Sequence, residues 1–309
     1  NSDFEKIQFL ANVDAKVGSR LKIGINSVAS RGEQNGVSTQ SSGSDPVGSV
    51  NGGGDDVISL AFRFSPDVGR YNDAGNFSQN TVGDDIENPW AVATQISNET
   101  KTDNTRTNLY LDLKIFEGLS FKTTLGYRTQ NSRQGYFKPQ TFVLSAGGAF
   151  LESVKRTRLL NENYLTYTTA IGQGNLTAIA GHSYQISTTE GLEAGARGLL
   201  TDAFSWHNLV AGQVDQRTVD SRFSESEIES VFGRANFEWA GKYLLTTTVR
   251  RDGASNFAAN NKYAIFPSVA VGWKISKEKF LAGSKTLSNL KLRASYGLTG
   301  NQAIGPYES

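Results

Sequence analysis

The feature that most constrains this sequence is a regular alternation of apolar and polar residues in short segments. In TRTNLYLDLKIF (residues 105–116), leucines fall at every second position, with Tyr110 and Asp112 between them. After a short stretch at 117–119, the segment SFKTTLGYR (120–128) alternates in the same way. Alternation with period two places successive side chains on opposite faces of a β-strand. The two segments therefore predict an antiparallel hairpin with a tight turn.

The same pattern recurs along the whole chain. Its further instances lie at 11–17 with 21–27, 163–172 with 175–185, 232–239 with 242–250, the end of 250–275, and 290–298. Short turns are predicted at 18–20, 117–119, 172–174 and 240–241. The sequence thus predicts an all-β, antiparallel protein of about ten strands.

Long polar stretches separate these hairpins. They cover residues 33–104, 131–156 and 188–224 and are rich in Gly, Asn, Asp and Ser, with one short helix expected at 55–66. Long connections without structure are uncommon in a compact soluble domain. Outer-membrane β-barrels combine tight turns at one end with long extracellular loops at the other. This asymmetry favours a barrel.

Composition narrows the class further. No run of 18 apolar residues occurs, which excludes a transmembrane helix, so a membrane protein of this sequence must cross with β-strands. The absence of cysteine excludes disulfides and thiolate sites within the chain. A net charge of +1 argues against a nucleic-acid coat or an acid-binding surface built on bulk charge, so no nucleic acid is expected as a partner. Because no signal peptide opens the sequence, we expect a piece of a longer, processed protein.

Charged residues recur on one face of nearly every predicted strand, so that face must meet water or a polar plug. The opposite face would meet lipid, and five aromatic residues on it are candidates for the girdles at the membrane boundaries: Phe237, Trp239, Tyr243, Trp273 and Tyr296. Val271 is placed on the lipid face near mid-membrane and Ser295 on the lumen face. A soluble β-sandwich also has one apolar face, and periodicity does not separate the two.

The segments 243–280 and 287–308 carry a more specific signal. They resemble the SusC/RagA family of TonB-linked outer-membrane proteins, whose pattern has an R-x-D-G-S-S-x-F loop, then F-P-S, G-W-x-I-x-x-E-x-F, and L-K-L-R-x-S-Y-G-x-T-G-N-Q. The matching residues are Arg250, Asp252, Gly253, Ser255, Phe257, Phe266, Pro267, Ser268, Trp273, Ile275, Glu278, Phe280, residues 290–297, Thr299, Gly300, Asn301 and Gln302. Ala254 departs from the usual Ser. Segments 87–93 and 118–127 are also similar to the family's mid-barrel region.

This resemblance implies a nutrient importer of the bacterial cell outer membrane, in which a 22-stranded barrel surrounds a plug. A SusD-like surface lipoprotein would act as its lid, and the TonB complex would act through the plug region. Residues 1–309 would all belong to the TonB-dependent receptor β-barrel domain, with the plug and C-terminal strands absent. About ten strands do not close such a barrel, so the fragment alone should not transport cargo. The cargo, glycan or peptide, stays open.

Candidate reactive sites are few. His182 and His207 lie on separate segments, and His182 is expected to face the lumen or lie in a girdle. Gly52, Gly53 and Gly54 lack the Lys-Ser/Thr of a phosphate loop. Asp84, Asp85 and Glu87 lack a calcium-binding register. No nucleophile, base and oxyanion donors occur together, so the sequence predicts no enzyme, no cofactor, no metal and no catalytic residue, and it identifies no substrate-binding residue.

Two further points remain as expectations. Tyr71, Trp90 and Trp206 fall in predicted extracellular loops, where packing of the loops is favoured over stacking on sugar rings.

The competing functions are a non-transporting adhesive or structural barrel and a secreted glycan-binding β-sandwich.

The stretch RRDGASNF (250–257) is interpreted as a hairpin at the barrel rim. Arg250 would point inward, while Arg251 and Asp252 would lie where the strand leaves the membrane, with an arginine pairing to Asp252. Gly253, Asn260 and Asn261 are expected to supply unusual backbone angles. Pro267 is expected near the start of the returning strand, because it lacks an N–H.

Overall fold

The computed structural model of the chain describes residues 2–36, 57–80, 86–142, 147–258, 260–281, 286–301 and 304–307. Within these residues the backbone forms one ten-stranded sheet, in which each strand pairs antiparallel with its neighbours in sequence. The strands are β1 Asp3–Val17, β2 Leu21–Asn35, β3 Ser97–Phe116, β4 Leu119–Lys138, β5 Gly148–Ile171, β6 Gly174–Arg197, β7 Arg217–Trp239, β8 Tyr243–Ala254, β9 Tyr263–Lys274 and β10 Lys291–Gly297. The predicted all-β antiparallel fold is confirmed.

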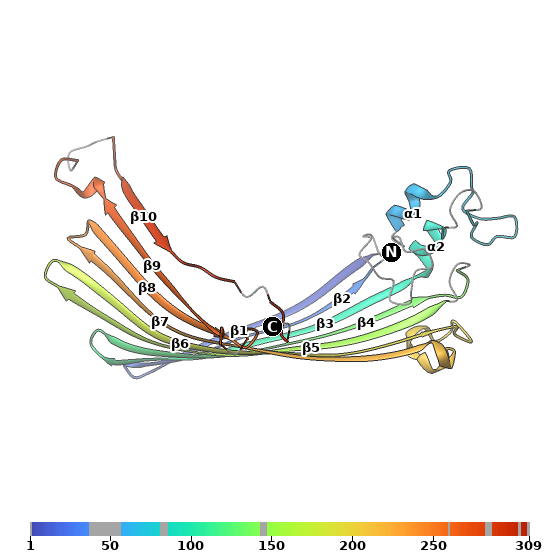
Figure 1. The fold of residues 1–309 in the computed structure, drawn as a ribbon, viewed down its shortest axis with the longest axis horizontal. Helices are drawn as coiled ribbons and strands as arrows, with labels where there is room; N and C mark the ends of the chain where they lie inside the picture. Colours follow the sequence, from blue (N-terminus) through green and yellow to red (C-terminus); the bar gives the residue numbers. More distant parts are fainter. Residues whose placement is uncertain are drawn as a thin grey trace.

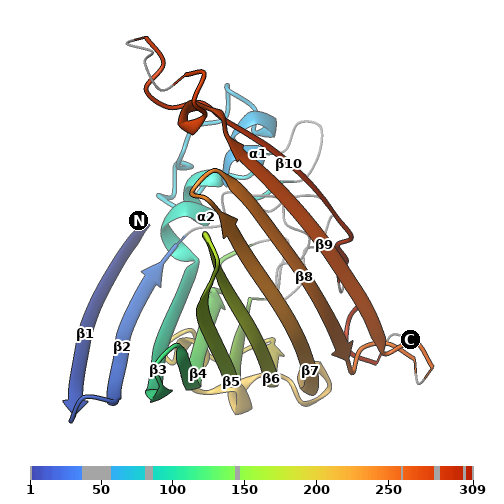
Figure 2. The same cartoon turned by 90° about the vertical axis from the view of Figure 1, so that its left-hand side faces the viewer.

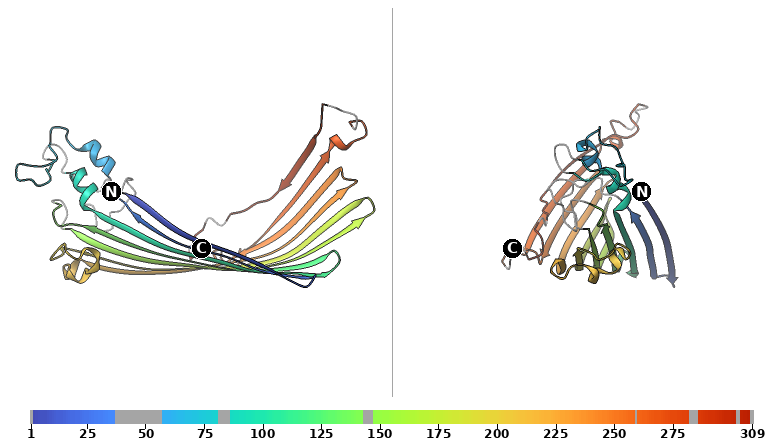
Figure 3. Two further views of the ribbon diagram at one scale, coloured as in Figure 1. Left: turned by 180° about the vertical axis from the view of Figure 1, so that it is seen from behind. Right: turned by 90° about the vertical axis from the view of Figure 1, so that its right-hand side faces the viewer.

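The sheet is strongly curved and open (Figures 1 and 3). Its strands lie side by side in sequence order from β1 to β10 (Figure 2), and β1 and β10 each pair on one side only. A sandwich needs two sheets packed face to face. Because the described residues form a single sheet, the β-sandwich alternative is wrong, and the open, curved wall fits part of a barrel.

The connections separate into two ends. The turns β1–β2, β3–β4, β5–β6 and β7–β8 gather at one end, on the left in Figure 1, together with the β9–β10 connection and its 3-10 helix η4 (Ile275–Lys277). We call this the short-turn end and the opposite end the long-loop end. In the β7–β8 turn Ala240 and Gly241 both have positive φ, 49° and 67°, as a type I′ hairpin turn requires.

The strands β3 to β7 are longer than the sequence pattern predicted. They contain 20 to 24 residues, whereas a tilted membrane strand needs about 9–11. The loops predicted at 33–104, 131–156 and 188–224 are therefore longer than the observed connections, because their ends belong to strands. The connections between strands cover only 36–96, 139–147 and 198–216.

The physical reason for this error lies on the apolar face of the strands. Towards the long-loop end that face becomes charged, with Arg31 opposite Asp103 and Lys155 opposite Glu190. Arg31 Nε lies 2.7 Å from Asp103 Oδ1. A strand that is polar on both faces has no period-two hydropathy signal and looks like a loop.

Short helices occupy the long-loop end. The helix expected at 55–66 is confirmed as α1, Val57–Arg63, while α2, Pro89–Gln95, was not predicted. The Asn88 side chain caps α2, because its Oδ1 accepts hydrogen bonds from Trp90 N at 2.9 Å and Ala91 N at 3.4 Å. Three 3-10 helices follow β6, namely η1 Ser205–His207, η2 Leu209–Ala211 and η3 Val214–Gln216.

Two small cores hold the long-loop end together. One joins α1, α2 and the β4–β5 connection through Leu60, Ile86, Ala91, Val92 and Phe142. The other covers the ends of β4, β5 and β6 through Phe137, Ala149, Ala196 and Leu199, with Trp206 and Leu209 packed against it. None of the helices in the described part of the chain is long and apolar enough to cross a membrane.

Candidate functional site: the two faces and the two rims of the sheet

The strand register divides the side chains between two faces. Residues directly opposite each other share a face, so the apolar face carries Ala15, Ile23, Leu111, Leu165, Ala180, Leu245 and Val271. The other face, here the charged face, carries Asp14, Lys22, Tyr110, Lys122, Arg128, Glu152, Arg222, Glu238, Lys274 and Arg293. Val271 and Ser295 lie on opposite faces, as predicted.

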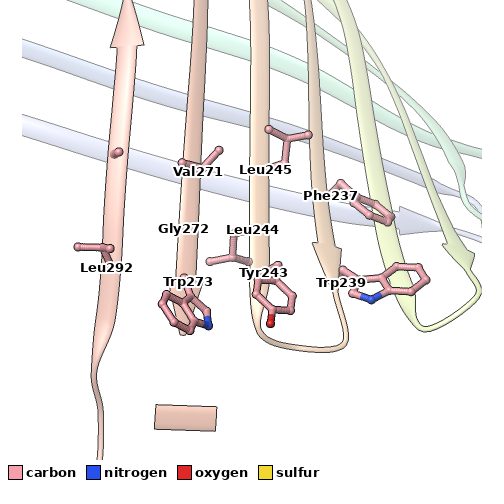
Figure 4. A pocket seen from close by; sticks show the side chains of 10 residues that line it. Phe237, Trp239, Tyr243, Leu244, Leu245, Val271, Gly272, Trp273 and Leu292 are labelled. Atoms are coloured by element: carbon pink, nitrogen blue, oxygen red, sulfur yellow. The ribbon is translucent and has the colours of Figure 1, made fainter. Parts of the chain in front are cut away.

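The aromatic residues of the apolar face collect at the short-turn end. Trp239 is opposite Tyr243, which is opposite Trp273, and Phe237 lies beside them (Figure 4). With Leu245, Val271, Leu292 and Ala294 they line a hollow of almost purely apolar surface. Four of the five predicted girdle residues are thus together. Tyr296, the fifth, is opposite Val269 and lies further along the sheet.

Glu278, which follows η4, connects two residues of this aromatic group to the β7–β8 turn. Its carboxylate accepts hydrogen bonds from Lys242 Nζ at 2.7 Å, Tyr243 Oη at 2.8 Å and Trp273 Nε1 at 3.0 Å. These three donors lower the pKa of Glu278 to about 2, the Lys242 bond contributing most. The sequence predicted Trp273 as a girdle residue but gave no role to Glu278, because the contact between the two depends on the bend after β9.

Residues 250–254 of the stretch RRDGASNF form the last part of β8, and residues 255–257 follow the strand. Arg250 Nε donates to Asp252 Oδ1 at 2.6 Å, and its Nη2 donates to the buried Ser230 Oγ at 2.9 Å. Arg251 points to the other face, where its guanidinium lies 4.0 Å from the ring centroid of Tyr263. The predicted pairing with Asp252 is confirmed, and Arg250 makes it.

The backbone of this stretch differs from the prediction. Gly253, Asn260 and Asn261 do not have positive φ. Gly253 is required for another reason, since a Cβ at this position would overlap the ring of Tyr263, which lies directly opposite in β9. The glycine therefore makes room for an aromatic ring and does not form a turn.

Pro267 also lies deeper in its strand than predicted. It is the fifth residue of β9 and is opposite Val249. Its carbonyl accepts the N–H of Leu298 at 3.0 Å, just beyond the end of β10. In an antiparallel pair the reciprocal bond would need the proline N–H. Because that donor is missing, the pairing of β9 with β10 ends here.

Many charges of the charged face are neutralised within the sheet. Near the short-turn end, Lys22 Nζ lies 3.4 Å from Asp14, and Lys22 and Lys122 lie 5.4 and 5.3 Å from the centroid of the Tyr110 ring. Nearer the long-loop end, Arg222 bonds Glu193 at 3.0 Å and also contacts Glu152. This face is therefore a polar wall rather than a hydrophobic core.

These features meet in one known architecture. A family model described as TonB dependent receptor-like, beta-barrel, matches residues 43–307. The chain belongs to the TonB-dependent receptor β-barrel family. The family consists of receptors and transporters rather than enzymes, and its members are outer-membrane proteins.

Individual relatives agree with this family. TonB-dependent receptor P3 of Formosa agariphila is 46% identical, with all of this chain aligned to 30% of that protein. TonB-dependent receptor SusC of Bacteroides thetaiotaomicron is 35% identical over 46% of this chain and 14% of its own length. The RagAB peptide transporter structure has the same fold, with a TM-score of 0.80 at 21% identity, over 99% of this chain and 34% of that chain. The chain thus spans about a third of the P3 and RagAB chains.

Membership in the receptor family gives the sheet its orientation. The apolar face of the receptor meets lipid, the charged face lines the lumen, the short-turn end is periplasmic and the long-loop end is extracellular. Val271 lies only two residues from the girdle residue Trp273. It is therefore nearer the periplasmic interface than the predicted mid-membrane position.

The aromatic residues of the receptor's extracellular connections make contacts within the connections or with the sheet. Trp206 packs on the core at the ends of β4, β5 and β6. Trp90 lies under the guanidinium of Arg70, 3.8 Å from the ring centroid, and Tyr71 lies 5.1 Å from Phe77. These contacts agree with the predicted packing role.

The histidines of the receptor lie apart. His182 is on the lipid face, where its Nε2 lies 3.1 Å from Glu229 Oε1. Of its two expected positions the lumen is therefore wrong, and a place in a girdle stays a prediction. His207, in η1, lies against Trp206. In the part of the chain that the structure describes, no three His, Asp or Glu residues gather as a metal site. Residues 52–54, Asp84 and Asp85 lie outside the described residues.

Proposed function

We propose that this chain is part of the wall of an outer-membrane importer that takes up nutrients too large for porins. Glycans or peptides would enter at the extracellular end, under a SusD-like surface lipoprotein. The TonB complex would supply energy through a plug held in the lumen. The membrane partner of the wall is outer-membrane lipid.

The observation that carries this proposal is the lumen wall itself. A ladder of charged and hydroxyl side chains follows β2 to β9 from the periplasmic rim into the extracellular strand extensions. A wall whose inner face is hydrophilic along the whole length of the strands fits a barrel interior filled by water or by a polar plug. The RagAB peptide transporter, which has the same fold, supports the same function.

Deletion of the gene for the full-length protein tests the proposal. Cells lacking it should lose growth on one class of glycan or peptide, and the intact gene should restore it. Restoration should also require TonB, because import against a closed plug needs energy. Growth that is unaffected by loss of the gene or of TonB would instead support the alternative of an adhesive or structural barrel.

A further inference from the structure

Four arginines gather on the lumen face of β3, β4 and β5. Arg106 is directly opposite Arg128, and Arg128 is directly opposite Arg158. Arg156 lies two positions further along β5 on the same face, and all four side chains are exposed. Like charges placed directly opposite each other destabilise an antiparallel pair. The cluster therefore needs a reason outside the packing of the sheet.

The arginines of this cluster lack acidic partners within the described residues. Elsewhere on the same wall Arg222 bonds Glu193 and Glu152, and Arg250 bonds Asp252. For the four arginines of the cluster, no ion pair with an aspartate or glutamate of the described part of the chain is formed. Their positive charge is left available to an anion from outside the wall.

The surroundings of the cluster add further hydrogen-bond donors. Arg128, Arg156 and Arg158 line a hollow of about 170 Å³, and Gln130, Ser187 and Thr189 line it from the same face. On the lumen face Ser187 is opposite Arg158, and Thr189 is opposite Arg156. Planar guanidinium groups bind carboxylate, sulfate and phosphate oxygens in a two-pronged geometry, and hydroxyl and amide groups supply single donors. The hollow thus has the chemistry of an anion site.

The position of the cluster along the strands shows from which side an anion would reach it. On the lipid face of the same strands, the charged residues Asp103 and Lys155 begin within three residues of Arg106 and Arg158. Charged outward residues mark the end of the apolar band. The arginines therefore lie at the extracellular end of the membrane-spanning wall, where a molecule entering from outside meets the lumen.

We propose that this arginine cluster binds anionic groups of the imported molecule, so that the cargo is an oligomer carrying carboxylate or sulfate groups. This inference rests on the proposed import function. Acidic side chains of the plug are a second source of the same chemistry. The extracellular position of the cluster favours the cargo.

The test uses the full-length receptor with its plug and its lipoprotein partner. Binding of three labelled oligomers of equal length is measured at low and high salt: oligogalacturonate, dextran sulfate and neutral dextran. The triple variant Arg128→Gln, Arg156→Gln, Arg158→Gln is compared with Arg133→Gln. Arg133 is the matched control because it is an equally exposed arginine of β4 on the opposite face.

We expect the wild type to bind at least one anionic oligomer more tightly than dextran, with an affinity that falls at high salt. The triple variant should lose on the order of tenfold affinity for each arginine removed, while Arg133→Gln keeps wild-type affinity. Equal binding of anionic oligomers by the triple variant and the wild type would overturn the proposal. If that result came with an altered unfolding midpoint, the cluster would be assigned to plug carboxylates.

A parallel uptake measurement separates this inference from the proposed function. TonB-dependent uptake of dextran by wild type and triple variant alike, without uptake of the anionic oligomers, overturns the anionic cargo and leaves import intact. Absence of TonB-dependent growth on any nutrient would refute import itself. The binding measurement then still decides whether the arginines hold anions.

Discussion

The assignment of the apolar face to lipid predicts a depth-dependent cost for a charge on β9. Val269 and Val271 both lie on this face, four and two residues before the girdle residue Trp273. At about 3.4 Å per residue and a tilt of about 40°, Val269 stands on the order of 10 Å above the girdle and Val271 about 5 Å. The apolar band is about 25 Å tall, so Val269 is close to its middle.

We therefore expect Val269→Arg to lower the free energy of unfolding of the intact receptor by about 2–4 kcal/mol, the cost of an arginine near the bilayer midplane. Val271→Arg should cost less, because the arginine can extend towards the nearer interface. Ser295→Arg, on the lumen face opposite Ala270, should cost least of the three. Val269→Ala separates the loss of the valine from the gain of a charge.

The measurement is reversible unfolding of the full-length receptor from lipid vesicles in guanidinium chloride. The order of costs Val269, Val271, Ser295 supports the assignment. Equal costs at Val269 and Ser295 would show that the faces are reversed or that the strand does not contact lipid. A larger cost at Val271 than at Val269 would place the midplane nearer the periplasm and refute the depth calculation.

Three other predictions concern the rims. The folded pKa of Glu278, about 2, lies below the ordinary value, so this carboxylate should stabilise the fold above about pH 4.5 and lose that effect as pH falls towards 2. In a Glu278→Gln receptor the unfolding midpoint should therefore change less with pH over this range. Gly253→Ala should destabilise the receptor, and Tyr263→Ala should relieve most of this loss in a double-mutant cycle, since the new Cβ meets that ring. Trp206→Ala should open residues 198–216 to limited proteolysis, because it removes a side chain packed on the extracellular core, whereas Leu200→Ala, at an 88% exposed position, should leave the cleavage rate unchanged.

The sequence predicted the fold where one face of a strand meets lipid and the other meets water. Around Leu111 the period-two signal is strong because lipid selects the apolar face. Beyond Asp103 and Lys155 charged residues occur on both faces and the regular alternation breaks down, so the strand extensions could not be told from loops. Those extensions still pair by backbone hydrogen bonds, which leave no mark in side-chain hydropathy.

The candidate site was harder to predict from the sequence than the fold. Arg128 and Arg158 are far apart in the chain, and their meeting depends on the register across β4 and β5, which the poorly predicted 131–156 region obscured. The contacts of Glu278 depend likewise on a bend after β9. The family motif includes Glu278, but its hydrogen bonds to the girdle residues Tyr243 and Trp273 became visible only in the structure.

The unbroken strands have a mechanical consequence. From β4 to β7 the register of each pair continues without a shift from the periplasmic turns to the extracellular ends, so the membrane-spanning wall and the extracellular strand extensions are one hydrogen-bonded shell. Such a shell has no hinge at which these extensions could move relative to the membrane-spanning wall. Under the proposed import function, opening and closing of the path would then be done by parts that sit in or above this shell, with the shell as their fixed frame.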